Sequence, residues 1–132
     1  MSGRMRRFGN VFVGVLLRSP LHRTLSGSLI LISYRGRKSG REYTVPVAYA
    51  EDADGLIVFV GHSEAKTWWR SMPGANVLVH LRGVDFDADA RVVRGSSLAS
   101  AYLARQPRSA GVIAAETDPV FVRLERLRPL AG

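Results

Sequence analysis

The chain contains no cysteine, and this absence removes several classes of chemistry at once. It excludes disulfides, a thiolate nucleophile and zinc sites with cysteine ligands, and it agrees with a cytoplasmic location. The histidines, His22, His62 and His80, are far apart and show no metal-ligand spacing, so no metal site is predicted. No catalytic triad or carboxylate pair can be assembled either. If the protein is an enzyme, the reactive group is therefore expected to come from a bound cofactor.

Acidic residues are also missing from the first part of the chain. Residues 1–41 hold nine Arg and Lys residues and no Asp or Glu, whereas residues 42–132 hold ten basic and eleven acidic residues. The net charge of +8 is therefore concentrated in one region. A local excess of this kind indicates a partner with phosphate or carboxylate groups, an anionic lipid surface or a nucleic acid.

The segment of residues 1–27 is predicted as an amphipathic helix followed by a connector. Phe8, Val11, Phe12, Val15 and Leu16 fall at helical spacing. The apolar stretch is seven residues long, and a bilayer-spanning helix needs about 20. Two interpretations stay open: peripheral contact of residues 4–18 with an anionic membrane, or packing of the helix on its own domain.

Residues 28–132 are predicted as one β-rich domain. Strands are expected at residues 29–34, 43–50, 56–61, 76–81, 85–93 and 120–127, and short helices at residues 63–72 and 98–105. Arg82 and Gly83 form a two-residue hairpin signal between two of the strands. Short strands with hairpin-scale links predict a mainly β (α+β) fold, a small antiparallel barrel.

The most basic stretch of the domain is a turn between two predicted strands, "GRKSGRE". Its glycines allow a sharp turn and close approach of a ligand. The side chains suited to an oxyanion are Arg37, Lys38, Ser39 and Arg41. The turn is therefore predicted to be an anion-binding cradle, and the alternative is a solvated basic hairpin tip.

Two further features accompany this turn. Trp68 and Trp69 are neighbours on a predicted helix, about 100° apart, so one should face the core and the other a groove edge. The start of that helix adds donors and a positive dipole end, from Ser63, Lys66 and Thr67. Pro46 lacks an N–H group, which predicts an edge strand, a bulge or a ligand-facing segment.

Together these stretches resemble a known family. The runs "LLRSPLHRTLSGSLILISYRGRKSGREYTVPVAYA", "TWWRSM" and "NVLVHLRG" are similar to the deazaflavin-dependent nitroreductases, actinobacterial members of the flavin/deazaflavin oxidoreductase superfamily. The resemblance implies a split β-barrel of the FMN-binding type that binds coenzyme F420, a deazaflavin with a phosphate and glutamates in its tail. It implies hydride transfer to a quinone, enone or nitro-type acceptor.

The resemblance also implies a set of site residues. Arg37, Lys38, Ser39 and Arg41 would hold the tail, and Val45, Pro46 and Val47 would lie along the ring. The rest of the groove would come from Gly61, His62, Ser63, Lys66, Thr67 and Trp68. Tyr34, Tyr49 and Tyr102 are candidates for proton donation, substrate lining or packing. Two alternatives stay open: FMN as the cofactor, and a non-enzymatic nucleic-acid-binding barrel. A nucleic acid partner is nevertheless not expected. The protein would be a monomer or a homodimer.

Overall fold

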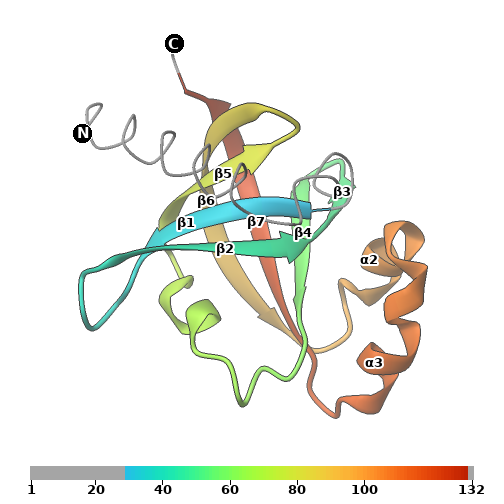
Figure 1. Ribbon diagram of the computed structural model, residues 1–132. Helices are drawn as coiled ribbons and strands as arrows, with labels where there is room; N and C mark the ends of the chain where they lie inside the picture. Colours follow the sequence, from blue (N-terminus) through green and yellow to red (C-terminus); the bar gives the residue numbers. More distant parts are fainter. Residues whose placement is uncertain (1–28, 131–132) are drawn as a thin grey trace.

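The computed structural model describes residues 29–130 (Figure 1). The predicted amphipathic helix and the membrane contact of residues 4–18 lie outside the described residues. Among those described, no helix is both long and apolar enough to cross a membrane.

One antiparallel sheet forms the body of the described chain. Its strands are β1 (Leu29–Arg35), β2 (Glu42–Ala48), β3 (Ala50–Asp52), β4 (Gly55–Val60), β5 (Asn76–Leu81), β6 (Val84–Arg94) and β7 (Val120–Pro129). They follow the order β2-β1-β5-β6-β7-β4-β3. The predicted hairpin at Arg82 and Gly83 is confirmed: both have positive φ, 47° and 81°, as the tight turn between β5 and β6 requires.

The sheet is curled because its two edges are joined by a single residue. β2 and β3 lie at opposite ends of the strand order, and only Tyr49 separates them in sequence. Consecutive Cα atoms are about 3.8 Å apart, so the two edges must approach each other at Tyr49. The predicted small antiparallel barrel is confirmed. The single strand expected at residues 43–50 is wrong, because the chain bends at Tyr49 and starts a separate strand there.

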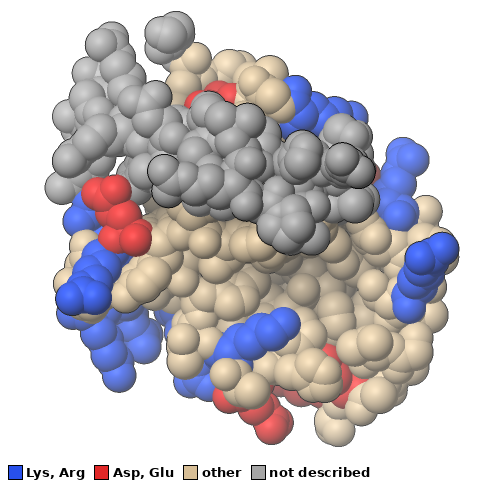
Figure 2. All heavy atoms as spheres, in the orientation of Figure 1, with Lys and Arg blue, Asp and Glu red and all other residues tan. Residues whose placement is uncertain are grey.

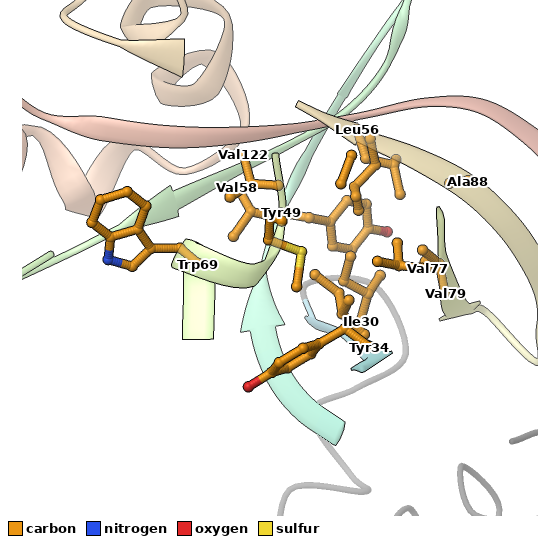
Figure 3. Packing of buried hydrophobic residues seen from close by; sticks show 14 of the residues in the cluster. Ile30, Tyr34, Tyr49, Leu56, Val58, Trp69, Val77, Val79, Ala88 and Val122 are labelled. Carbon is orange, nitrogen blue, oxygen red and sulfur yellow. The ribbon is translucent and has the colours of Figure 1, made fainter. Parts of the chain in front are cut away.

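The barrel interior holds the main core, and a second cluster lies outside it. The residues of β4 alternate between the two, with Val58 in the main core and Ile57 in the outer cluster beside Phe121 of β7. This explains why β4 is apolar along most of its length rather than alternating with polar residues. Figure 3 shows the inner cluster, with Trp69 at one side and Tyr34 at its margin.

Helices cover the outer face of β4 and β7. The predicted helix at residues 98–105 is confirmed as α2 (Ala99–Arg105), and η3 (Pro107–Ser109) and α3 (Ala110–Ala115) follow it. Tyr102 of α2 and Ile113 of α3 pack in the outer cluster. Figure 1 shows both α-helices together on one side of the barrel.

The helix predicted at residues 63–72 is wrong. Residues 61–65 form turns, and only a 3-10 helix, η2 (Trp68–Ser71), follows. His62 has a φ of 54°, and the Ser63 carbonyl accepts a hydrogen bond from Trp69 Nε1 at 2.9 Å. The carbonyl at the expected helix start is thus used by a side chain, and the expected helix dipole near Ser63 is absent.

Candidate functional site: a basic groove between the β1–β2 hairpin and η2

The turn that joins β1 to β2 is closed by its own backbone. Gly36 N–H donates to the Arg41 carbonyl at 2.7 Å, and Gly40 N–H donates to the Gly36 carbonyl at 3.0 Å. Arg35 donates to the Gly40 carbonyl at 2.8 Å and pairs with Glu42 across the strands. These bonds fix the turn while the side chains of residues 37–39 stay exposed.

The tryptophans of η2 divide as the sequence predicted. Trp69 is 6% exposed and belongs to the main core, whereas Trp68 is half-buried and lines a groove. Neighbouring residues of one short helix therefore line the groove edge and pack in the core.

A groove of ≈ 640 Å³ lies between the hairpin and η2. It is lined by Tyr34, Gly36, Arg37, Lys38, Ser39, Tyr43, Thr67, Trp68, Arg70 and Ser71. One hydrogen bond joins its two walls: Arg37 N–H donates to Ser71 Oγ at 3.0 Å, across 34 residues of sequence. The basic turn and the tryptophan segment, two separate signals in the sequence, therefore meet at one site.

The groove carries positive charge without local compensation. Arg37, Lys38 and Arg70 line it, and no Asp or Glu does. Most arginines elsewhere are neutralised: Arg35, Arg82, Arg91, Arg94, Arg123, Arg126 and Arg128 each pair with a carboxylate. Among the described residues, the three groove cations have no such partner. Figure 2 shows several Lys and Arg side chains, with an acidic group beside them, at the left edge of the molecule, where Figure 1 places the hairpin tip.

Two stacked tyrosines complete one wall. Tyr34 of β1 and Tyr43 of β2 are direct cross-strand partners, with ring centroids 5.5 Å apart and an interplanar angle of 27°. Figure 3 shows the Tyr34 hydroxyl directed away from the other labelled core residues. Burial, and then the nearby Tyr43, raise the pKa of Tyr34 above its usual value, so its hydroxyl keeps its proton at neutral pH. The groove thus offers an aromatic surface beside its cations.

The donor set fits a cofactor with an aromatic ring and an anionic tail. Guanidinium and ammonium groups without a protein counter-charge suit phosphate and carboxylate groups. Tyr43, which is exposed and stacks on the buried Tyr34, and the half-buried Trp68 offer apolar faces to a planar ring. Of the predicted site residues, the groove brings together Tyr34, Arg37, Lys38, Ser39, Thr67 and Trp68.

The other predicted residues do not line this groove. Val45 and Val47 continue along β2 on the face of Tyr43 and pack against the main core, whereas Pro46 points to the opposite face and is exposed. Of the three alternatives predicted from Pro46, the structure shows the edge strand, since β2 is a terminal strand of the sheet among the described residues. Arg41, Gly61, His62, Ser63 and Lys66 also lie outside the lining.

All three candidate tyrosines are buried, and of the three only Tyr34 also lines the groove. The Tyr49 ring lies in the main core and Tyr102 lies in the outer cluster. Burial raises the pKa of the Tyr102 hydroxyl, against a smaller opposite effect of a hydrogen bond with Ser109.

Sequence reasoning missed four lining residues: Gly36, Tyr43, Arg70 and Ser71. Gly36 belongs to the predicted basic turn but was not among the predicted site residues. Tyr43 had an available signal, because it follows the basic turn and pairs with Tyr34 in the predicted hairpin. The sequence held no signal for Arg70 and Ser71, because their placement at the groove depends on where the 3-10 helix starts and not on a motif.

Comparison with known proteins gives one sequence relative and a set of similar folds. No family model matches the chain. The chain is 32% identical over 79 residues to a Mycobacterium tuberculosis protein named "Putative F420H(2)-dependent quinone reductase". The match covers 58% of this chain and 63% of the relative, so the chain spans less than two thirds of that protein.

Solved structures establish the fold. A structure described as an F420-H2 dependent reductase matches 74% of this chain and 94% of its own, with a TM-score of 0.53 and 21% identity. One described as a domain-swapped dimer matches 83% and 96%, with a TM-score of 0.58 and 19% identity. The fold is that of the split β-barrels, and the sequence match to a named F420H2-dependent reductase confirms the resemblance to the deazaflavin-dependent reductases.

Proposed function

We propose that the protein is a deazaflavin-dependent reductase that transfers a hydride from reduced coenzyme F420 to a small quinone, enone or nitro-type acceptor. The observation that carries the proposal is the groove, in which Arg37, Lys38 and Arg70 lie beside an aromatic wall with no carboxylate among the lining residues. The quinone is favoured among the acceptors by the name of the sequence relative.

Each wall of the groove has a distinct task in this proposal. Reduced deazaflavin, when bound, supplies the hydride. Arg37 and Lys38 hold the anionic tail, and the closed turn keeps their backbone fixed. Trp68 and the tyrosine pair orient the ring and exclude water from one side of it. Tyr34 keeps a proton on its hydroxyl at neutral pH and can donate it beside the ring.

The proposal is tested first by binding. Purified protein is titrated with F420 and, in parallel, with FMN, by fluorescence at two salt concentrations. We expect F420 to bind more tightly than FMN, and the F420 affinity to weaken as salt rises, since the tail contacts are ionic. FMN affinity equal to or above that of F420 would instead assign the groove to FMN.

A double variant tests the role of the basic turn. Arg37→Ala with Lys38→Ala should weaken F420 binding by about 100-fold or more, because two charge-assisted contacts of about 1.5–3 kcal/mol each are lost. Arg126→Ala is the control, since Arg126 is an exposed arginine paired with Asp89 on the far part of the sheet. Unchanged F420 affinity in the double variant would refute the tail assignment.

Turnover then tests the reaction itself. Loss of the F420H2 absorbance on addition of menadione, compared with a nitro acceptor, reports hydride transfer and acceptor preference. Size-exclusion chromatography with light scattering in the same buffer separates a monomer from a homodimer, the state suggested by the domain-swapped neighbour.

A further inference from the structure

Arg70 occupies an unusual electrostatic position on the η2 wall of the groove. Its guanidinium carbon lies 5.1 Å from the centroid of the Trp69 ring, and that of Arg94 lies 5.2 Å from the same centroid. Arg94 is neutralised by Asp118 at 3.3 Å. Among the described residues Arg70 has no carboxylate partner, so one of two guanidinium groups on a shared ring lacks a counter-ion. An anion in the groove would supply it.

The ring also limits where Arg70 can go. Trp69 is buried, and its Nε1 is held by the Ser63 carbonyl at 2.9 Å. A guanidinium stacked on a fixed indole loses less side-chain freedom on binding an oxyanion than a free arginine does. Arg70 is therefore preorganised at the groove wall opposite the basic turn.

Ser71, the next residue, has a hydroxyl group that can donate a hydrogen bond. Its Oγ accepts the Arg37 N–H at 3.0 Å, which uses one acceptor position of the hydroxyl and leaves the O–H donor unused by that bond. Among the described residues, no acceptor contacts this donor. Ser71 lines the same groove as Arg70 and is half-buried there. A cation and a neutral donor thus lie side by side on one wall.

We propose that Arg70 and Ser71 form a second oxyanion subsite, so that the groove clamps a ligand with two or more phosphate or carboxylate groups between η2 and the basic turn. Arg37 and Lys38 bind one group of the ligand, and Arg70 and Ser71 bind another. The inference rests on the proposed function, where this ligand is the tail of the deazaflavin cofactor. It makes η2 the element that distinguishes a multiply charged tail from a singly charged one.

Binding of two cofactor forms to Arg70→Gln tests the subsite. Intact F420 and the same deazaflavin without its phosphate and glutamates are titrated against both proteins. We expect Arg70→Gln to weaken intact F420 by about tenfold, the scale of one charge-assisted contact. The tail-less form should change by less than about twofold. Arg108→Gln is the matched control, since Arg108 is exposed, has no carboxylate partner among the described residues and lies outside the groove.

Ser71 requires a pair of variants because it also positions Arg37. Ser71→Ala should weaken intact F420 by about threefold to tenfold, and Ser71→Thr, which restores a hydroxyl, should recover most of that loss. Equal weakening by both variants, or equal effects on both cofactor forms, would mean that Ser71 is a packing residue and that the subsite lacks its donor.

Failure of the subsite and failure of the cofactor assignment give different results. If wild-type protein and Arg70→Gln bind F420 with equal affinity, the subsite is overturned and the proposed function stays intact. If wild-type protein does not bind F420, the proposed function is overturned, and calorimetry with tripolyphosphate decides the subsite. Binding of tripolyphosphate that Arg70→Gln weakens and Arg108→Gln does not supports it; no binding, or equal binding by both variants, overturns it.

Discussion

Charged residues serve two opposite purposes in this molecule. In the groove, three cations have no carboxylate partner among the described residues, and we propose that they bind an external anion. Below the helices, Arg123 of β7 binds both carboxylate oxygens of Asp52 at 2.6 and 2.9 Å, and Arg123 is only 5% exposed. This second arrangement ties the short edge strand β3 to the interior of the sheet, across β4.

Asp52→Asn should destabilise the fold, because it leaves the buried Arg123 without a counter-charge. Asp52 is 26% exposed, so the expected loss is about 1–3 kcal/mol, between the ranges for exposed and buried pairs. Urea unfolding at pH 7 measures it. Glu51→Gln breaks an exposed pair with Arg82 and should cost at most about 1 kcal/mol.

The same pair gives a pH dependence with a defined sign. The Arg123 hydrogen bond holds the pKa of Asp52 below its ordinary value of 3.8. A lowered folded-state pKa contributes stability above the unfolded-state pKa, and this contribution is lost as pH falls through the folded-state pKa. The stability difference between wild type and Asp52→Asn should therefore shrink below about pH 4. A difference that stays constant to pH 2.5 would contradict this account.

Individual site residues were predictable to different degrees. Arg37, Lys38 and Ser39 carry their own signal, because clustered cations and glycines in one turn are typical of anion-binding turns, although a solvated basic hairpin tip has the same sequence pattern. Arg70 carries none: its role depends on the ring of Trp69 and on the distance between two elements remote in sequence. A single sequence without contacts cannot supply that distance.

At the scale of elements, the hairpin turn places its two glycines under different constraints. A methyl group at Gly36 would lie 2.8 Å from Tyr43 Cε2 and 2.9 Å from Ser39 Oγ. A methyl group at Gly40 would meet nothing within 4 Å, but the residue has a φ of 71°. One position is limited by the groove side chains and the other by the backbone.

Alanine at these glycines should therefore separate binding from stability. Gly36→Ala displaces the ends of movable side chains, so F420 affinity should fall while stability changes by less than about 1 kcal/mol. Gly40→Ala should cost about 1–2 kcal/mol of stability, because an L residue in the left-handed region is strained, with F420 affinity nearly unchanged. Thermal unfolding and fluorescence titration measure the two effects. If Gly36→Ala binds like wild type, the positions of Tyr43 and Ser39 do not shape the site.

Strands were better predicted than helices, for a physical reason. β6 shows apolar residues at alternate positions, β5 is a short apolar run, and the Arg82-Gly83 turn fixes their register. The segment 63–72 has good helix-forming composition, yet the Trp69 indole takes the Ser63 carbonyl and a positive φ at His62 precedes it. α3 escaped prediction because its small residues have little periodicity, and Ile113 alone anchors it in the outer cluster.

At the scale of the whole molecule, barrel closure depends on one bend that the sequence hides. The apolar alternation runs through Tyr49 without interruption, so residues 43–50 read as one strand. The structure instead places Tyr49 at the junction of both sheet edges, with its ring in the core. Its carbonyl accepts a hydrogen bond from Gln106 Nε2 at 2.8 Å, at the end of α2.

Gln106 therefore links the outer helices to the closure of the barrel, and Gln106→Leu should loosen that closure. Loss of the donor leaves the Tyr49 carbonyl without its partner, at a cost of about 1–3 kcal/mol. Hydrogen exchange should quicken in β2 and β3, which meet at Tyr49, and change little in the central β5–β6 hairpin. Arg105→Gln, at an exposed neighbouring position, should stay within about 0.5 kcal/mol of wild type. Uniform acceleration across all strands would mean that closure and global unfolding are one event, and the helices would then act on stability as a whole rather than on the junction.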